Sequence, residues 1–475
     1  MTSNVRPDPD RLLVDITDYV CDDTARGESA IDAARLCMTD ALACGLDALD
    51  FRECTKLLGP LVPGIVVPHG ARVPGTRYEL DPATAAFNLG CMIRWHDFND
   101  TFTAVQGSHP SDNFAGTLML ADYLSRQRVA NGGEPLVVAD VLEATIKAYE
   151  IQCCIAIEND FGRCGVDHTL LTRVASAAVL TRMLGGTRGQ VLSAVSNAWM
   201  DAGLVVFRHA PNTGTRKSWA SAEVIAQAMR YAFMAVKGEM GYPSVLTARQ
   251  YGFYDARFGG KAFTFERPFG DYVIQHSMFK LVAAGMHSQS AVEAAFRLHP
   301  LVKDRIDDIV RIELHSQRAL MGIMNKTGPL YNPADRDHCV QYLVAVGLLH
   351  GRLALQDLED DFAADPRIDR LREKSVLAEE PRYTRDFYDA DKRSSANALQ
   401  VFFSDGTATP RIEIEYPAGH PRRRTEALPL LQAKFESSLA RRYAATRCER
   451  IIALCNDART LDRTPVDEFL ALLVA

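Results

Sequence analysis

The sequence predicts a mainly α-helical protein with a smaller α+β second domain. Three observations lead to this prediction. Long segments rich in Ala, Leu and Met with helical spacing fill the first part of the chain, alternating strand-like runs begin only after about residue 300, and helical spacing returns from residue 426. We therefore expect a helical domain over 1–272, an α+β lid domain over 273–422 and C-terminal helices over 423–475.

The first domain contains four segments that run well beyond strand length. Their apolar residues recur at three- and four-residue steps, with small residues between them. This spacing is typical of helices that pack closely and have much of their circumference covered. The four segments are 31–50, 169–185, 190–203 and 219–237.

The second domain combines strands with helices. The run IVRIELHS places Val310, Ile312 and Leu314 on one face by strict alternation, the period of a half-buried strand. Two further alternating runs, in NALQVFFSDGTATPRIEIEYP, flank Asp405-Gly406, a dipeptide typical of hairpin turns. One face of such a sheet needs helical cover. Helical spacing persists in two nearby segments, 289–297 and 339–354.

The overall charge argues against binding to polyanions. The chain has 475 residues, with 53 basic and 60 acidic side chains and a formal net charge of −7. This balance gives no basic excess to attract nucleic acid or an anionic membrane surface. No apolar run approaches the roughly 18 residues of a membrane span. We expect a protein without a nucleic-acid or membrane partner.

The N-terminal residues indicate that the protein stays in the cytoplasm. The first twenty residues, MTSNVRPDPDRLLVDITDYV, contain four aspartates. They lack a cationic stretch followed by an apolar one, and they lack the acid-poor pattern of a transit peptide. The eleven cysteines are scattered between Cys21 and Cys455 with no CxxC pair. Buried thiols in a reducing compartment explain them best, and we expect no metal and no cofactor.

Familiar short catalytic motifs are missing from the sequence, which contains no GxGxxG, GxxxxGK[ST], HExxH or GxSxG string. Polar residues instead gather in RWHDFNDT and in GSHPSDN, within twenty residues of each other. Pro110 restricts His109 to extended or turn geometry near a predicted helix start. His109 is a candidate for proton transfer, but the segment equally fits a capping turn with a solvated histidine.

A second polar cluster, FRHAPNTGTRKSW, contains Arg208 and Lys217 just before a predicted helix. Cationic side chains and the N–H groups of a helix start complement carboxylates or phosphates, although a basic surface loop explains the same pattern. Lys280 lies between QHSMF and LVAAGM, where an apolar setting would depress its pKa unless the side chain extends to solvent. Further polar groups stand in Asp167-His168, Tyr331-Asn332-Pro333 and Asp335-Arg336-Asp337-His338, and each by itself is more typical of a structural role. Together these residues suggest a polycarboxylate pocket.

Long strings of the sequence, in their order, resemble the MmgE/PrpD family and within it the branch of 2-methylcitrate dehydratases. The resemblance extends over nearly the whole chain. It implies a large helical domain completed by the C-terminal helices, an α+β lid, an active site in the cleft between them, and a homodimer without metal. The strings are RWHDFNDT, GSHPSDN, GVDHTLL, RHAPNTGTRKSWA, GEMGYPSVLTA, MHSQSAVEAA and GPLYNPADRDHCVQY.

The resemblance also implies an active site, since this family includes cis-aconitate decarboxylase, whose pattern can be transferred position by position. It implies a catalytic set of His109, Lys280 and His168. It also implies a substrate-binding set of Asp97, Thr101, Lys217 and Tyr331, to which the basic loop adds Arg208. Base and acid stay unassigned.

The expected activity is the elimination of water from 2-methylcitrate, a step of propionate breakdown in the methylcitrate cycle. A decarboxylase of the same fold is one alternative, but Gly285 stands where that enzyme carries a histidine. Another polycarboxylate isomerase or epimerase is a second alternative. A non-enzymatic tricarboxylate-binding protein is a third, and the density of proton-transfer groups argues against it.

Overall fold

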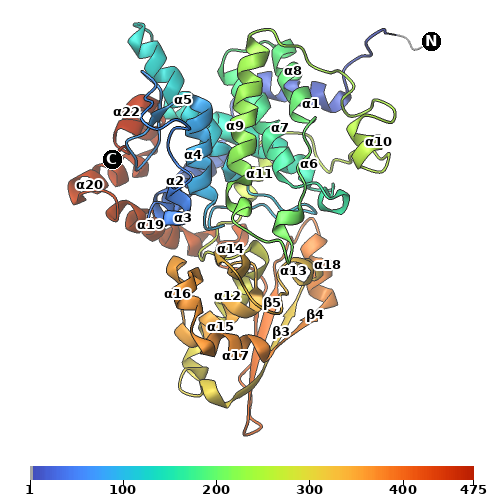
Figure 1. Ribbon diagram of the computed structural model, residues 1–475, viewed down its shortest axis with the longest axis vertical. Helices are drawn as coiled ribbons and strands as arrows, with labels where there is room; N and C mark the ends of the chain where they lie inside the picture. The colour runs from blue at the N-terminus through green and yellow to red at the C-terminus, as the bar shows by residue number, and fades with distance from the viewer. Residues whose placement is uncertain (1–3) are drawn as a thin grey trace.

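The computed structural model describes residues 4–475, which form a large helical body above a smaller α+β part (Figure 1). This agrees with the predicted fold class. Residues 4–475 contain no helix that is long and apolar enough to cross a membrane. The main helices of the body are α1 (Arg11–Cys21), α2 (Glu28–Ala48), α4 (Pro82–Arg94), α5 (Phe114–Ala130), α6 (Val138–Ala156), α7 (Thr169–Met183), α8 (Arg188–Ala198) and α9 (Arg216–Val236).

Small residues let the central helices of the body approach closely. Helix α9 packs against both α4 and α7. A Cβ added at Gly90 of α4 would lie 2.9 Å from the Cβ of Ala222 on α9, a separation that real Cβ atoms essentially never show. The Ala- and Gly-rich spacing seen in the sequence therefore sets the distance between these helices, as ridge-and-groove packing requires.

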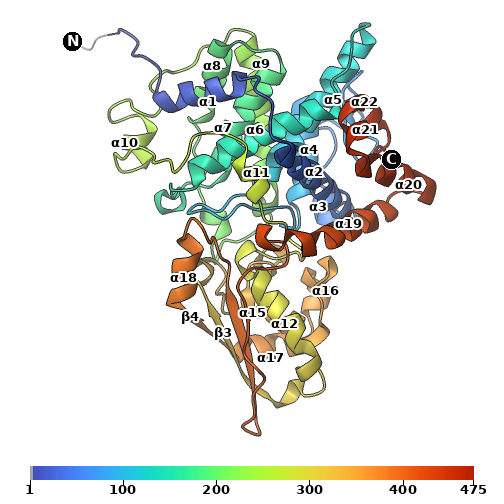
Figure 2. The same ribbon diagram turned by 180° about the vertical axis from the view of Figure 1, so that it is seen from behind.

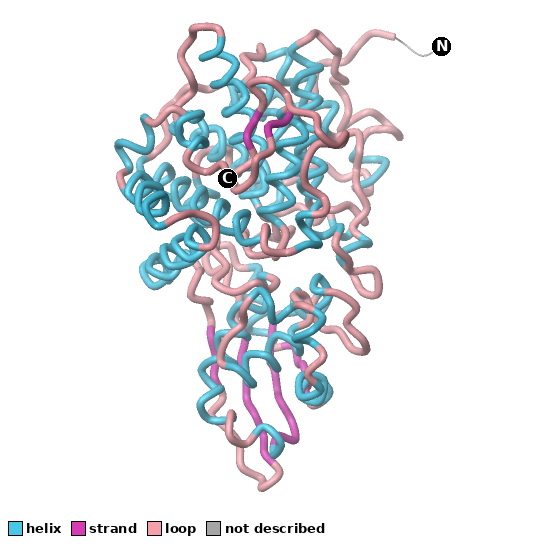
Figure 3. Tube along the Cα trace, turned by 60° about the vertical axis from the view of Figure 1, so that its left-hand side comes forward, coloured by secondary structure: helices cyan, strands magenta, loops and turns pink. Residues whose placement is uncertain are grey.

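The α+β part is built on a four-stranded sheet in the order β4-β3-β5-β6. Strand β3 pairs in parallel with β4 and antiparallel with β5, which in turn pairs antiparallel with β6. Helix α12 packs on β5, β6 and α15, and Figure 3 shows helices lying along the sheet. The strands are β3 (Ile309–Ser316), β4 (Ser375–Glu379), β5 (Asn397–Phe403) and β6 (Ile412–Ile414), and the covering helices are α12 (Gln289–Val302) and α15 (Val340–His350).

One detail of the predicted strand is wrong. Ile312 and Leu314 are buried as expected, but the Val310 side chain is exposed, at 52%. The register of β3 against β5 shifts between Ile309 and Arg311, so Val310 and Arg311 both face outward. Such a bulge inserts one residue and interrupts the strict alternation that the sequence suggests.

The hairpin turn at Asp405-Gly406 is confirmed, with β5 before it and β6 after it. Gly406 has φ +85°, in the left-handed region that favours glycine. The Asp405 carboxylate accepts hydrogen bonds from the backbone and hydroxyl of Thr407, at 2.9 and 2.6 Å, which fix the turn.

The C-terminal helices lie against the helical body. Helix α19 (Arg424–Ala440) packs on α2, and α22 (Val466–Ala471) packs on α5, so the last part of the chain joins the first (Figure 2). The division of the chain at residues 272 and 422 stays a prediction. The segment that connects the sheet to α19 contacts the chain before α12, where the Phe279 N–H donates to the Gly419 carbonyl at 3.0 Å.

Candidate active site

Asp97 lies at the centre of a buried cluster of charged side chains between the helical body and the α+β part. It follows α4 in the left-handed conformation, with φ +50°, which aspartate tolerates better than most residues. Its carboxylate accepts a hydrogen bond from Arg94, the last residue of α4, and one at 2.6 Å from the Nζ of Lys280. The turn after α4 thus directs the carboxylate at two cations.

These cations keep Asp97 ionised. Burial by itself would raise the pKa of the Asp97 carboxyl, but Arg94 and Lys280 outweigh it and hold the pKa well below its usual range. Burial also lowers the pKa of Lys280 to about 8, against the opposing attraction of Asp97. Lys280 is therefore a group that can exchange a proton near neutral pH.

A second buried group joins the two parts of the molecule. Lys217, in the first turn of α9, donates to both carboxylate oxygens of Asp337 at 2.6 and 2.5 Å. The Nδ1 atom of His338 lies 2.7 Å from Asp337 Oδ1, and its Nε2 lies 3.5 Å from Asp97 Oδ2. Asp337 and His338 come from the α+β part, so the cluster is complete only when the two parts meet.

His109 is buried and faces the same carboxylate. Its Nδ1 lies 2.9 Å from the backbone carbonyl of Asp100, and its Nε2 lies 3.6 Å from Asp97 Oδ1. A carbonyl can only accept, so Nδ1 carries the hydrogen and Nε2 presents a lone pair. Burial, together with Arg94 and Lys280, lowers the pKa of His109 well below its usual value. Of the two sequence interpretations, the structure excludes a solvated histidine.

His168 and Arg208 form the far side of the cluster. The rings of His168 and His109 have centroids 5.7 Å apart. Burial, followed by the charge of Arg208, lowers the pKa of His168 to about 3. Arg208 is paired with the buried Asp167, at 3.1 Å from Nη2 to Oδ1, so its charge is already compensated within the chain.

The cluster brings three buried cations together. Arg94, Lys217 and Lys280 supply the positive charges, which Asp97 and Asp337 contact directly, and the buried Asp112 lies 3.9 Å from Arg94. The cations are therefore balanced within the chain and held in fixed positions. Cationic groups held in this way in a buried setting suit an anionic ligand.

The same charges disfavour a metal ion. Asp97, Asp337 and His338 bring three donor atoms within 4.8 Å of one another, a spacing at which metal ligation is possible. Lys280 and Lys217, however, donate to these two carboxylates at 2.5 to 2.6 Å. A divalent cation would have to displace both ammonium groups or lie against them, which Coulomb repulsion opposes.

Two of the expected binding residues lie apart from these ion pairs. Thr101 is fully buried, and its hydroxyl donates to the backbone carbonyl of Ser108 at 2.9 Å. Its backbone pairs with Met278, two residues before Lys280, so Thr101 positions that segment. The Tyr331 side chain is 72% exposed and lies on the loop before α14 (Pro333–Arg336). Its role stays a prediction.

A cavity of about 440 Å³ borders the cluster at Asp337. His96 and Ser218 line it from the helical body and Asn332 lines it from the α+β part. Burial lowers the pKa of His96 to about 3, and its ring packs edge-on against Phe51 with centroids 4.2 Å apart. His96 therefore faces this cavity as a neutral side chain.

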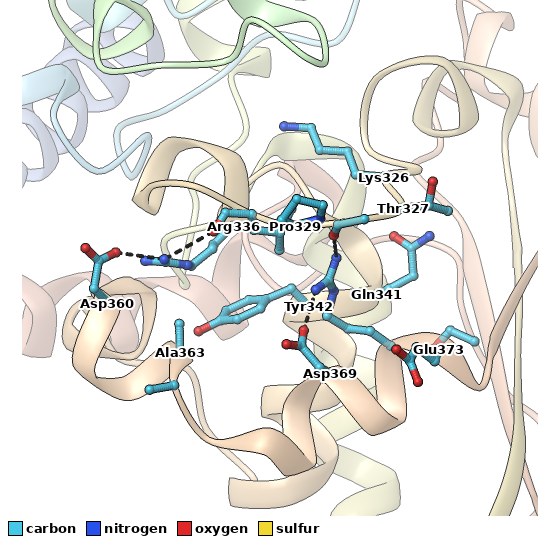
Figure 4. Close-up of a pocket in the computed structure, with 15 residues that line it drawn as sticks. Lys326, Thr327, Pro329, Arg336, Gln341, Tyr342, Asp360, Ala363, Asp369 and Glu373 are labelled. Atoms are coloured by element: carbon cyan, nitrogen blue, oxygen red, sulfur yellow. Dashed lines mark hydrogen bonds and ion pairs between the residues drawn. The ribbon is translucent and has the colours of Figure 1, made fainter.

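A larger cavity, of about 650 Å³, lies inside the α+β part between α14, α16 (Asp360–Ala363) and α17 (Pro366–Glu373) (Figure 4). Its cationic groups are already paired. Arg336 is 2.7 Å from Asp360, and Arg372 donates to the Gly328 carbonyl at 2.8 Å. None of the catalytic and substrate-binding residues expected from the sequence lines this cavity.

The sequence places Arg94, Asp337 and His338 in polar strings of the predicted pocket but indicates no individual role for any of them. Arg94 could have been found, because it lies three residues before Asp97 at a helix end, a spacing that brings side chains together. Asp337 and His338 stand in the string ADRDHCVQY, but no local feature distinguishes them from the other charges there. Only the folded chain brings them to Asp97, more than two hundred residues away in sequence.

Comparison with known proteins gives one consistent result. The MmgE/PrpD N-terminal domain matches residues 14–266, and the MmgE/PrpD C-terminal domain matches residues 282–458. A 2-methylcitrate dehydratase of Salmonella typhimurium (strain LT2) is 52% identical over 476 residues, covering 99% of both chains. One of Cupriavidus necator is 52% identical over 470 residues, covering 98% of this chain and 97% of its own. A mitochondrial 2-methylcitrate dehydratase of Yarrowia lipolytica is 46% identical over 481 residues, covering 100% of this chain and 92% of its own.

Proposed function

The chain belongs to the MmgE/PrpD family, and from that membership we propose that it is a 2-methylcitrate dehydratase, a hydro-lyase of propionate breakdown in the methylcitrate cycle. The observation that carries the proposal is whole-length similarity, at 52% identity, to relatives with this name. The three buried cations around Asp97, which are Arg94, Lys217 and Lys280, support it, because the substrate is a tricarboxylate and cationic donors bind carboxylates.

The reaction removes a proton from the methyl-bearing carbon and expels the hydroxyl group of the neighbouring carbon, which gives 2-methyl-cis-aconitate. As the C–H bond breaks, negative charge builds on a carboxylate that is already anionic. Cations held in a water-poor site stabilise that state more than they stabilise the substrate. Arg94, Lys217 and Lys280 are positioned by Asp97 and Asp337 before substrate arrives, so little reorganisation is needed.

We assign roles to the predicted residues on this basis. His109 and Lys280, which both approach Asp97 Oδ1, handle protons at the reacting carbons. Lys217, His168 and Arg208 hold substrate carboxylates, and Asp167 positions Arg208. Asp97 orients the cations, and Thr101 holds the backbone near Lys280. Tyr331 is also proposed to bind substrate. Its side chain is exposed, so this role requires its loop to move toward the cluster.

The surroundings of Gly285 favour dehydration over decarboxylation. A Cβ added there would lie 2.9 Å from Met324 Cε and 3.3 Å from His338 Cε1. A histidine at this position, expected of the decarboxylase, would require both side chains to move. The space near Asp97 is instead filled by His338.

The proposal includes a homodimer and a cytoplasmic location, both expected from the sequence. All eleven cysteines are free, and most are buried, which suits a reducing compartment. Size-exclusion chromatography with light scattering measures the oligomeric state directly.

The test of the function is product identification. The purified chain is incubated separately with 2-methylcitrate, citrate and cis-aconitate, and the products are identified by NMR. We expect 2-methyl-cis-aconitate from 2-methylcitrate, with no loss of CO₂. Decarboxylation of cis-aconitate, an isomer of the substrate without an alkene, or tight binding without turnover would each point to a different function and contradict the proposal.

A further inference from the structure

Two imidazole rings approach the one Asp97 carboxylate from different parts of the molecule. His109, from the helical body, places Nε2 3.6 Å from Oδ1, and His338, from the α+β part, places Nε2 3.5 Å from Oδ2. Lys280 donates to Oδ1 at 2.6 Å, whereas Oδ2 is buried and accepts no hydrogen bond within residues 4–475, with Lys217 Nζ at 3.8 Å. Asp97 Oδ2 is therefore an acceptor that a proton on His338 Nε2 would satisfy.

Asp337 determines which nitrogen of His338 is free. A carboxylate can only accept a hydrogen bond, and Asp337 Oδ1 lies 2.7 Å from His338 Nδ1, so Nδ1 carries the hydrogen and Nε2 a lone pair. Lys217 is 3.1 Å from the same nitrogen, but its two shorter bonds go to Asp337. Lys217 thus keeps Asp337 anionic, and Asp337 holds the ring in this tautomer.

The Nε2 lone pair of His338 consequently faces another acceptor. Two acceptors 3.5 Å apart form no hydrogen bond, so this contact is unfavourable until a proton arrives. Once Nε2 is protonated, it becomes an N–H that points at an ionised carboxylate. The position is therefore suited to taking up a proton and stabilising the imidazolium that results, as a carboxylate does for a general base.

We propose that His338, oriented by Asp337, is the general base that removes the proton from the methyl-bearing carbon of the substrate. Of the two proton-transfer residues assigned above, Lys280 is then the acid, and His109 orients the substrate hydroxyl by accepting its hydrogen bond at the bare Nε2. This inference rests on the proposed function. The proton moves from carbon to Nε2, and the electrons of the C–H bond form the C=C bond. The C–O bond to the neighbouring carbon breaks, and the hydroxyl leaves as water with a proton from Lys280.

Asp97 lets the proton return from His338 to Lys280 after each turnover. After one turnover His338 carries an extra proton and Lys280 lacks one, and the same carboxylate contacts both, at 3.5 and 2.6 Å. Transfer of the proton along Asp97 from Nε2 to Nζ restores the starting state without any other reactant. Burial and Lys217 also lower the pKa of His338 to about 4, so the ring is neutral and able to accept a proton at pH 7.

The test compares His338→Ala and His338→Asn with the parent chain in buffered D₂O. We expect kcat to fall by about 10²-fold or more, with KM changed only a few-fold, since the group acts in proton transfer. In the reverse hydration, the rate at which solvent deuterium enters the methyl-bearing carbon should fall by the same factor as kcat. Added imidazole should partly restore kcat in His338→Ala, because the vacated space lies next to the reacting carbon.

His350→Ala is the matched control, since His350 lies at the end of α15, the helix that begins two residues after His338, and outside the cluster. It should keep parental kcat. If circular dichroism shows that His338→Ala does not fold, kcat and KM of His338→Asn are compared with those of the parent instead. A kcat within about threefold of the parent, or a change in KM alone, overturns the base assignment. Failure of the parent itself to dehydrate 2-methylcitrate overturns the proposed function instead.

Discussion

Lys280 donates from Nζ to the backbone carbonyl of Asp97 at 2.7 Å and to its carboxylate at 2.6 Å, across 183 residues of sequence. This double contact joins the α+β part to the turn that follows α4. It fixes both the position of a lysine that exchanges protons near neutral pH and the conformation of the carboxylate that it meets. Stability and chemistry therefore depend on the same pair.

The first prediction concerns stability. Asp97→Asn removes the counter-charge of buried Arg94 and Lys280, and breaking a buried pair in this way should lower the free energy of unfolding by roughly 3–5 kcal/mol. The control, Asp15→Asn, removes the partner of solvent-exposed Arg11 and should cost at most about 1 kcal/mol. Denaturation in urea, followed by circular dichroism, measures both. Equal losses of unfolding free energy in the two variants would show that Asp97 is not the centre of the cluster.

The second prediction concerns His109. His109→Ala should lower kcat by roughly 10²-fold or more while the chain stays folded, because the ring faces the reacting region with a bare Nε2. His69→Ala, at an exposed turn, should keep parental activity. Steady-state rates with 2-methylcitrate give kcat for both variants and for the parent chain. A kcat within a few-fold of the parent would assign His109 a structural role only.

The third prediction is a pH dependence that comes from Lys280. Its pKa of about 8 means that the ammonium form is lost as pH rises through that value, so kcat should decline above about pH 8. Lys280→Arg keeps a positive charge but cannot release a proton in this range. It should therefore lower kcat at every pH and remove the decline. Nearly full kcat in this variant would mean that Lys280 supplies charge alone.

The fourth prediction separates binding from chemistry at Lys217. Lys217→Ala should raise KM by about tenfold or more, because it removes a cation from a site that receives carboxylates, and each tenfold corresponds to about 1.4 kcal/mol. It should also reduce kcat, since Asp337 loses the charge that keeps it anionic. Lys237→Ala, exposed at the end of α9, is the control. An unchanged KM would contradict a carboxylate-binding role.

The fifth prediction is independence from metal ions. The ammonium groups of Lys217 and Lys280 already occupy the carboxylates that could serve as ligands, and the cysteines show no ligand spacing. Dialysis against EDTA should leave kcat unchanged. Loss of activity that Fe²⁺ or Zn²⁺ restores would contradict this prediction and would point to the Asp97, Asp337 and His338 donors.

The sequence by itself determined the fold class and part of the site. Helical spacing, strand alternation and the Asp405-Gly406 turn are local patterns, and local backbone preferences suffice to form the elements they predict. The same holds for His109 and Lys217, which stand in polar strings beside helix starts. Their chemistry could be inferred from neighbouring residues, and the structure places both of them in one buried cluster.

Tertiary structure alone decided what those residues meet. Asp97 became the centre because Lys280 and His338 reach it from distant parts of the chain, and burial shifts the pKa of each group only after the two parts close around them. The bulge that turns Val310 outward likewise depends on pairing between β3 and β5. Long-range pairing and desolvation are properties of the folded chain, and no local string contains them.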